Sequence, residues 1–122
     1  MKVGLKLENC EMIVLPQGVI YLGPSDKNQS VGFLKLNPHR KLTKHNRPVD
    51  EKLKQISGDC TIELYDKDRL SQEKELRQEE ELIIFANQYH VHKNPTGKES
   101  LTYWQFDGDI TKIIENIRKS KK

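Results

Sequence analysis

Short apolar runs alternate with turn-forming residues along most of the chain. Runs of this kind, bounded by Gly, Pro, Asn, Asp and Ser, are typical of β-strands joined by tight turns. Their regular spacing predicts a sandwich or barrel rather than strands that alternate with helices. We expect strands over residues 2–7, 11–15, 19–22, 32–36, 52–56, 60–65, 82–85 and 101–106.

The spacing of apolar residues changes near the end of the chain. Four isoleucines are spaced as one face of a helix, namely Ile110, Ile113, Ile114 and Ile117. Asp109 precedes them and is a suitable N-cap residue. This pattern predicts one short amphipathic helix that lies on the sheet. The mostly charged residues 66–81 are instead expected to form a solvated hairpin loop.

Composition favours the same all-β class. β-branched residues fit a pleated sheet, whereas Ala86 is the only alanine in the chain, which is unlike a bundle of long helices. The 122 residues are 34% hydrophobic, enough for one domain with a buried core. We therefore expect a single domain over 1–122, with a core in 32–106, N-terminal strands in 1–22, and a helix with a basic tail in 109–122.

The net charge of +3 comes from the end of the chain. Its last five residues include four cations: Arg118, Lys119, Lys121 and Lys122. The rest is close to neutral and lacks the basic face expected of a nucleic-acid-binding domain. No apolar stretch approaches the roughly 20 residues of a membrane span, and residues 1–12 do not resemble a secretory signal. We expect a soluble cytoplasmic protein with no nucleic-acid or membrane partner, in which Cys10 and Cys60 are free thiols.

The four histidines lie in two segments that carry the candidate chemistry. His45 and Glu51 flank a bend at Pro48, and His90 leads out of an expected buried strand. If these segments are neighbours in the fold, two imidazoles and a carboxylate converge. Such a set can occupy one face of a metal ion and leave its other positions open. Taken alone, scattered histidines are more often surface residues.

The spacing of these residues resembles the two motifs of the cupin superfamily. The first motif is matched by Pro38, His45, Glu51 and Gly58, and the second by His90 and Asn94. The chain departs from the family pattern at several positions. Arg47 stands where a second histidine is usual, His39 and Glu79 stand at glycine positions, and Phe85, Ala86 and Asn87 replace Pro-x-Gly. The resemblance covers residues 32–106.

This resemblance implies an antiparallel jelly-roll barrel, the cupin fold, with one short C-terminal helix. It also implies a divalent metal, Fe, Mn, Zn or Ni, held by His45, Glu51 and His90, although a metal-free pocket stays open as the alternative. His92 lies two residues along the strand from His90, so it is either a replacement ligand or a residue at the rim. His39 is expected to be exposed.

Arg47 has three interpretations, because a guanidinium keeps its proton and cannot ligate a metal. It forms an ion pair with Glu51, it binds a carboxylate or phosphate of the substrate, or it points outward. Gln55 has the parity of Glu51 and faces the interior. The substrate-binding candidates are therefore Arg47, Gln55, His92 and Tyr103.

Two function classes follow. The first is a metal-dependent enzyme acting on a small anionic or polar metabolite, with a dioxygenase, isomerase or lyase reaction left open. The second is a metal-free sensor or binding module for a small molecule. We also expect a homodimer in which residues 1–15 pair along or across the partner, since the edge strands of so short a barrel need cover.

Overall fold

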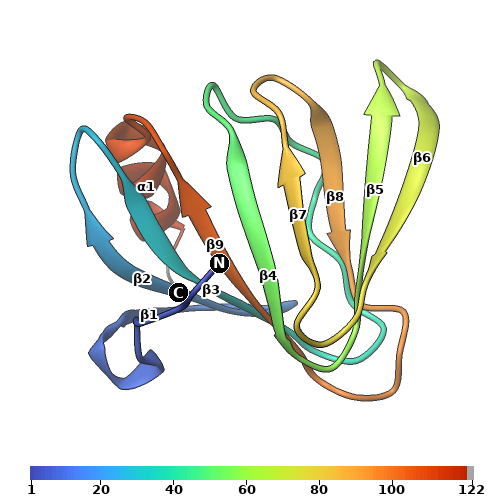
Figure 1. Ribbon diagram of the computed structural model, residues 1–122, viewed down its shortest axis with the longest axis horizontal. Coiled ribbons are helices and arrows are strands. Elements are labelled where there is room, and N and C mark those ends of the chain that lie inside the picture. The colour runs from blue at the N-terminus through green and yellow to red at the C-terminus, as the bar shows by residue number, and fades with distance from the viewer. Residues whose placement is uncertain (121–122) are drawn as a thin grey trace.

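The computed structural model describes residues 1–120 as two antiparallel sheets and a C-terminal helix (Figure 1). The larger sheet has the strand order β1-β2-β3-β9-β4-β7, and the smaller one has the order β6-β5-β8. The strands are β1 Glu11–Leu15, β2 Gly18–Ser25, β3 Ser30–Leu36, β4 Glu51–Ser57, β5 Cys60–Asp66, β6 Arg69–Leu76, β7 Glu81–Ile84, β8 Tyr89–Lys93 and β9 Ser100–Phe106. The predicted all-β jelly roll is confirmed. The predicted basic tail includes Lys121 and Lys122, which lie outside the described residues.

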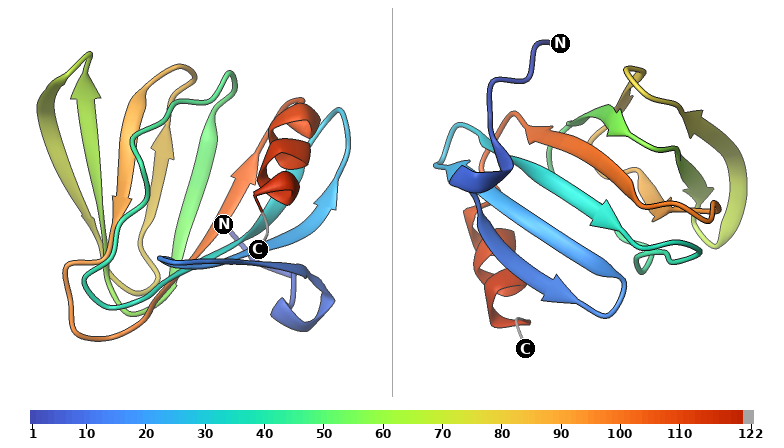
Figure 2. Two further views of the ribbon diagram at one scale, coloured as in Figure 1. Left: turned by 180° about the vertical axis from the view of Figure 1, so that it is seen from behind. Right: turned by 90° about the horizontal axis from the view of Figure 1, so that it is seen from below.

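The apolar core lies between the two sheets, which converge at one end of the molecule and diverge at the other (Figures 1 and 2). Strand alternation places Leu53 of β4 and Ile62 of β5 in this core, where neither side chain is exposed to solvent. Leu34 and Trp104 extend the core along β3 and β9. Glu51 shares the inward parity of Leu53, so the pleat of β4 directs its carboxylate into the same interior.

The N-terminal segment covers the outer face of the larger sheet. Val3 and Leu5 pack against a second buried cluster that contains Tyr21, Phe33 and Tyr103. The expectation of a strand over 2–7 is wrong, because this segment forms no strand and ends in a 3₁₀ helix, Leu7–Asn9. Val3 and Leu5 are partly buried across the face of the sheet, so these side chains find cover without pairing along an edge.

The predicted helix is present as α1, Thr111–Lys119. It lies against the inner side of β2, β3 and β9 and buries Ile114 in the core. Its N-cap is Ile110 rather than the predicted Asp109. The Asp109 carboxylate nevertheless accepts hydrogen bonds from the backbone N–H and the hydroxyl of Thr111, so it satisfies one of the free donors at the helix start.

The expectation of a loop over residues 66–81 is wrong. Within that range β6 pairs with β5 along the whole strand, from Cys60 opposite Leu76 to Asp66 opposite Arg69. Every β6 residue except Leu76 is exposed, so the sequence shows none of the apolar alternation that marks a half-buried strand. The pairing comes from backbone hydrogen bonds to β5, which contributes the buried side chains.

Both thiols in the described residues are free, with Cys60 buried and Cys10 partly exposed. Among residues 1–120, no helix has the length and apolar character that crossing a membrane requires.

Candidate metal centre

β8 directs two imidazoles into the interior. His90 and His92 are two residues apart, so strand alternation places them on the same face, opposite Leu64 and Ile62 of β5. Both side chains are almost fully buried. Because Ile62 belongs to the core, these histidines lie at its boundary rather than at the rim of the barrel. The rim interpretation of His92 is therefore wrong.

His45 comes from the irregular segment between β3 and β4, and the backbone fixes its place. The N–H of His45 donates to the carbonyl of His90 at 3.0 Å, and the N–H of His90 donates back at 2.9 Å. Leu42 donates to the carbonyl of His92 in the same way, at 3.0 Å. The segment thus runs beside β8 like an irregular fourth strand of the smaller sheet.

Glu51 is the first residue of β4 and is only 4% exposed. Its Oε1 lies 3.2 Å from Nε2 of His90, and its Oε2 lies 3.7 Å from Nε2 of His92. Among the described residues, three buried polar atoms of these side chains have no well-formed hydrogen bond: Oε1 of Glu51, Nε2 of His90 and Nδ1 of His92. Buried polar atoms normally have partners, so the facing pair of Oε1 of Glu51 and Nε2 of His90 indicates a group that binds beside them.

The four side chains suit a divalent metal. One potential ligand atom from each of His45, Glu51, His90 and His92 lies within 4.8 Å of the others. Three imidazoles and a carboxylate are a donor set that Mn, Fe, Ni and Zn accept, and a six-coordinate ion would keep open positions for a ligand. The orphaned atoms and the donor chemistry therefore both fit a metal ion here.

Two of the imidazoles are held in the tautomer that a metal needs. Nδ1 of His45 lies 2.9 Å from the carbonyl of Thr43, and Nδ1 of His90 lies 2.8 Å from the carbonyl of Gln88. A carbonyl only accepts, so each Nδ1 carries the proton when the ring is neutral and each Nε2 presents its lone pair.

The charge states are also those of metal ligands. Burial is the main cause that lowers the pKa of His45 to about 3, and the neighbouring His92, Arg47 and His90 side chains add to it, so this ring is neutral at pH 7. Burial raises the pKa of Glu51, but the electrostatic effect of His92 and the close polar contacts with both histidines outweigh it and hold that pKa well below its usual range. Glu51 is thus an anion in the interior.

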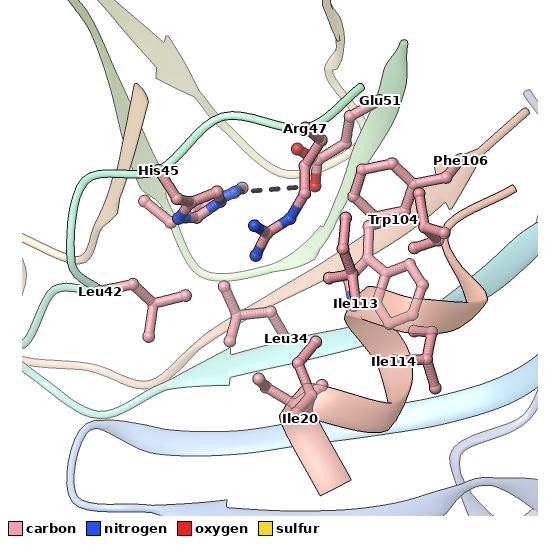
Figure 3. A pocket seen from close by; sticks show the side chains of 13 residues that line it. Ile20, Leu34, Leu42, His45, Arg47, Glu51, Trp104, Phe106, Ile113 and Ile114 are labelled. Carbon is pink, nitrogen blue, oxygen red and sulfur yellow. Dashed lines mark ion pairs between the residues drawn. The ribbon is translucent and has the colours of Figure 1, made fainter. Parts of the chain in front are cut away.

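A cavity opens beside the cluster and is lined by Arg47. Figure 3 shows the guanidinium pointing into the cavity between His45 and Ile113. Nη1 donates to the Asn46 carbonyl at 3.2 Å, and the guanidinium forms no ion pair with Glu51 in residues 1–120. Burial lowers the pKa of Arg47, and Glu51 partly opposes this effect. The inward position excludes the outward interpretation, and the missing contact excludes the ion pair.

Comparison with known proteins identifies the fold. No protein-family model and no curated protein matches the sequence. Solved structures do match. A conserved protein with a double-stranded β-helix domain from Klebsiella pneumoniae has a TM-score of 0.72 and 11% identity, over 88% of this chain and 91% of that one. This chain has the cupin fold.

Two other solved structures share this fold. BH2720 from Bacillus halodurans has a TM-score of 0.70 and 14% identity, over 76% of this chain and 72% of that chain. Oxalate decarboxylase from Bacillus subtilis, a protein with Mn(II) centres, has a TM-score of 0.75 and 17% identity. The match covers 84% of this chain but only 28% of the decarboxylase, so the chain spans less than a third of that enzyme.

The turns of both cupin motifs persist in the backbone although their glycines are absent. His39, Glu79 and Asn87 stand at glycine positions of the motifs, and all three have positive φ, of 59°, 74° and 68°. Gly58 is a motif glycine that this chain retains, and its φ is 66°. Such angles are rare for residues other than glycine and cost about 1 kcal/mol or more. His39 is exposed, as predicted.

Two of the predicted substrate contacts are not brought into the cavity. Gln55 does face the interior, but its amide donates to Ser100 and to the carbonyls of Ser57 and Gly58, and its oxygen accepts from Thr102. It joins β4 to β9 and has no free group for a ligand. Tyr103 points to the outer face of β9 and belongs to the buried cluster under the N-terminal segment.

The cavity wall was missed by reasoning from the sequence. Its main contributors are helix residues, including Ile113 and Ile117, together with Leu42 of the irregular segment. The spacing of the isoleucines predicts an apolar helix face, but nothing in it tells a core-facing helix from one that closes a cavity.

Proposed function

We propose that this cupin binds one divalent metal ion through His45, Glu51, His90 and His92 and acts as a metal-dependent enzyme on a small anionic molecule. The observation that carries the proposal is the convergence of one potential ligand atom from each of these four side chains within 4.8 Å, with Oε1 of Glu51 and Nε2 of His90 buried and unpartnered beside a neutral His45. His92 is the fourth ligand in this proposal, and it takes the place left by Arg47. A metal-free module would leave Oε1 of Glu51 and Nε2 of His90 buried with no well-formed hydrogen bond, which is costly.

A bound metal would supply Lewis-acid activation of a substrate oxygen or an activated water. The protein's own residues supply the rest. The Thr43 and Gln88 carbonyls orient two imidazoles. The Arg47 guanidinium binds the anionic group, and the apolar wall excludes bulk water from the ligand.

The Mn(II) centres of oxalate decarboxylase favour manganese as the first metal to test, alongside Fe, Zn and Ni. A cytoplasmic location accords with the two free thiols, since a reducing compartment keeps thiols unpaired.

The test is the metal content of protein purified without a histidine tag, after incubation with equal amounts of Fe, Mn, Zn and Ni and removal of free ions. We expect one ion per chain, and its loss in His45→Ala and His90→Asn. His39→Ala is the matched control, because His39 is exposed and outside the cluster. Well under one ion per chain in the wild type would favour the metal-free binding module instead.

A further inference from the structure

The cavity beside the metal cluster combines one cation with an apolar wall. Its polar lining consists of His45, Glu51 and His92 from the cluster, and Arg47. The remaining lining residues are all isoleucine, leucine, tryptophan or phenylalanine. Three of them, Leu34, Leu42 and Ile113, surround the guanidinium on the side away from Glu51 (Figure 3).

This lining disfavours ligands with many hydroxyl groups. Each hydroxyl that leaves water without a hydrogen-bond partner costs free energy, and the aliphatic wall offers none. The enclosed space is also small. It is about 50 Å³, so any group inside it lies close to the aliphatic wall. The mouth of the cavity is open, so an apolar group can extend outward along the wall.

The guanidinium suits a carboxylate. One of its N–H groups donates to the Asn46 carbonyl, which leaves the others free to face a ligand. A planar fork of donors matches the two oxygens of a carboxylate. A phosphate dianion needs more donors than this single cation provides, because Arg47 is the only arginine and there is no lysine among the described residues that line the cavity.

We infer that the ligand is a short monocarboxylate with an apolar body, its carboxylate between the Arg47 guanidinium and the metal and its apolar body against Leu34, Leu42 and Ile113. This inference rests on the proposed function, because the metal is one of the two partners of the carboxylate. It excludes sugars, sugar phosphates and other highly hydroxylated acids as the preferred ligands of this cavity.

The experiment is calorimetric titration of the full chain, loaded with Mn²⁺ and separately stripped of metal, with acetate, isovalerate, gluconate and methylphosphonate. We expect isovalerate to bind at least about tenfold more tightly than acetate, because it buries additional apolar carbons. Gluconate and methylphosphonate are expected to bind no more tightly than acetate. Equal binding of acetate and isovalerate, or tighter binding of gluconate or methylphosphonate, would overturn the inference.

Two variants test the two halves of the ligand. Arg47→Met is expected to weaken isovalerate binding at least about tenfold, whereas Arg40→Met, which changes an exposed arginine of the same segment, leaves it unchanged. Leu42→Asn is expected to lower the ratio of isovalerate to acetate affinity while acetate binding persists. Failure to take up Mn²⁺ contradicts the proposed function, and the series on stripped protein then still decides the ligand class.

Discussion

His45 and His90 exchange two backbone hydrogen bonds, of 3.0 Å and 2.9 Å, although they belong to segments far apart in the sequence. The pairing is an isolated antiparallel bridge, and it brings the two imidazole centroids to 4.4 Å. Each ring is held through Nδ1 by the carbonyl two residues before it. The same type of hydrogen bond therefore orients both rings, and the backbone bridge fixes the position of His45 opposite His90.

The first prediction concerns pH in the absence of metal. Burial lowers the pKa of His45 to about 3 in the folded protein, whereas a histidine in an unfolded chain titrates near 6.5. Between these values the unfolded state binds more protons, so the free energy of unfolding falls as the pH falls. We expect this ring to account for a loss of about 2 kcal/mol between pH 7.5 and pH 5, measured by urea unfolding in EDTA.

His45→Asn should remove most of that pH dependence. His39→Asn is the control, since His39 is exposed and asparagine tolerates its positive φ. A His45→Asn protein whose unfolding free energy changes with pH as steeply as the wild type would contradict the prediction. Glu51 acts in a different range, because its depressed pKa contributes stability that is complete above the ordinary carboxyl pKa and is lost as the pH falls below it.

Asn94, the last residue of the second motif, is predicted to stabilise the fold rather than to bind a ligand. Its amide is fully buried and donates to the carbonyls of Leu36, Asn37 and Lys98. Asn94→Ala leaves these acceptors unpaired, and we expect a loss of about 3 kcal/mol in thermal or urea unfolding.

Asn116→Ala is the control for that measurement. Asn116 is exposed on α1, so its loss should change stability by less than about 0.5 kcal/mol. An Asn94→Ala protein as stable as this control would show that water replaces the lost hydrogen bonds.

Arg47 is predicted to weaken the binding of metal alone. A permanent cation beside the cluster repels a divalent ion, and only an anion between them compensates. Arg47→Gln should therefore raise Mn²⁺ affinity about tenfold in the absence of carboxylate, as measured by calorimetry. Arg40→Gln should leave the affinity unchanged, and an unchanged affinity in Arg47→Gln would remove the electrostatic argument.

The homodimer remains a prediction, and β1 is where we expect it to form. β1 pairs with β2 on one side and is an edge of the larger sheet on the other. Its Met12 and Val14 are 48% and 54% exposed. Sedimentation velocity at micromolar concentration should give a dimer, and Val14→Lys should give a monomer. Leu70→Lys, at an exposed leucine of β6, should stay dimeric. A monomeric wild type would contradict the prediction.

The sequence was sufficient for much of the fold because apolar alternation marks the strands that face the core. It failed for β6, whose side chains are exposed and whose pairing comes from the backbone. The motifs were recognisable because His45, Glu51 and His90 keep their spacing while the glycine positions changed. At His39, Glu79 and Asn87 the backbone conformation persists, which a pattern of residue types does not record.

The site was predictable only in part. The parity of β8 suggested His92 as a ligand, but only the burial of its ring, at 4% exposure, separates that role from a place at the rim. Gln55 shows the opposite case. Its side chain does point inward, as its place in the alternation of β4 predicted. Its amide, however, is bonded to Ser100 and Thr102 of β9, and the sequence of β4 alone does not show which residues of β9 lie opposite.

The central claim is that four side chains hold one metal ion. Anomalous diffraction from crystals of the Mn²⁺-loaded protein tests it most directly, because it locates the ion without reference to activity. We predict a single strong peak within ligand distance, about 2.0–2.3 Å, of side-chain atoms of His45, Glu51, His90 and His92. A crystal with no peak between these residues, or a peak held by other residues, would contradict the claim.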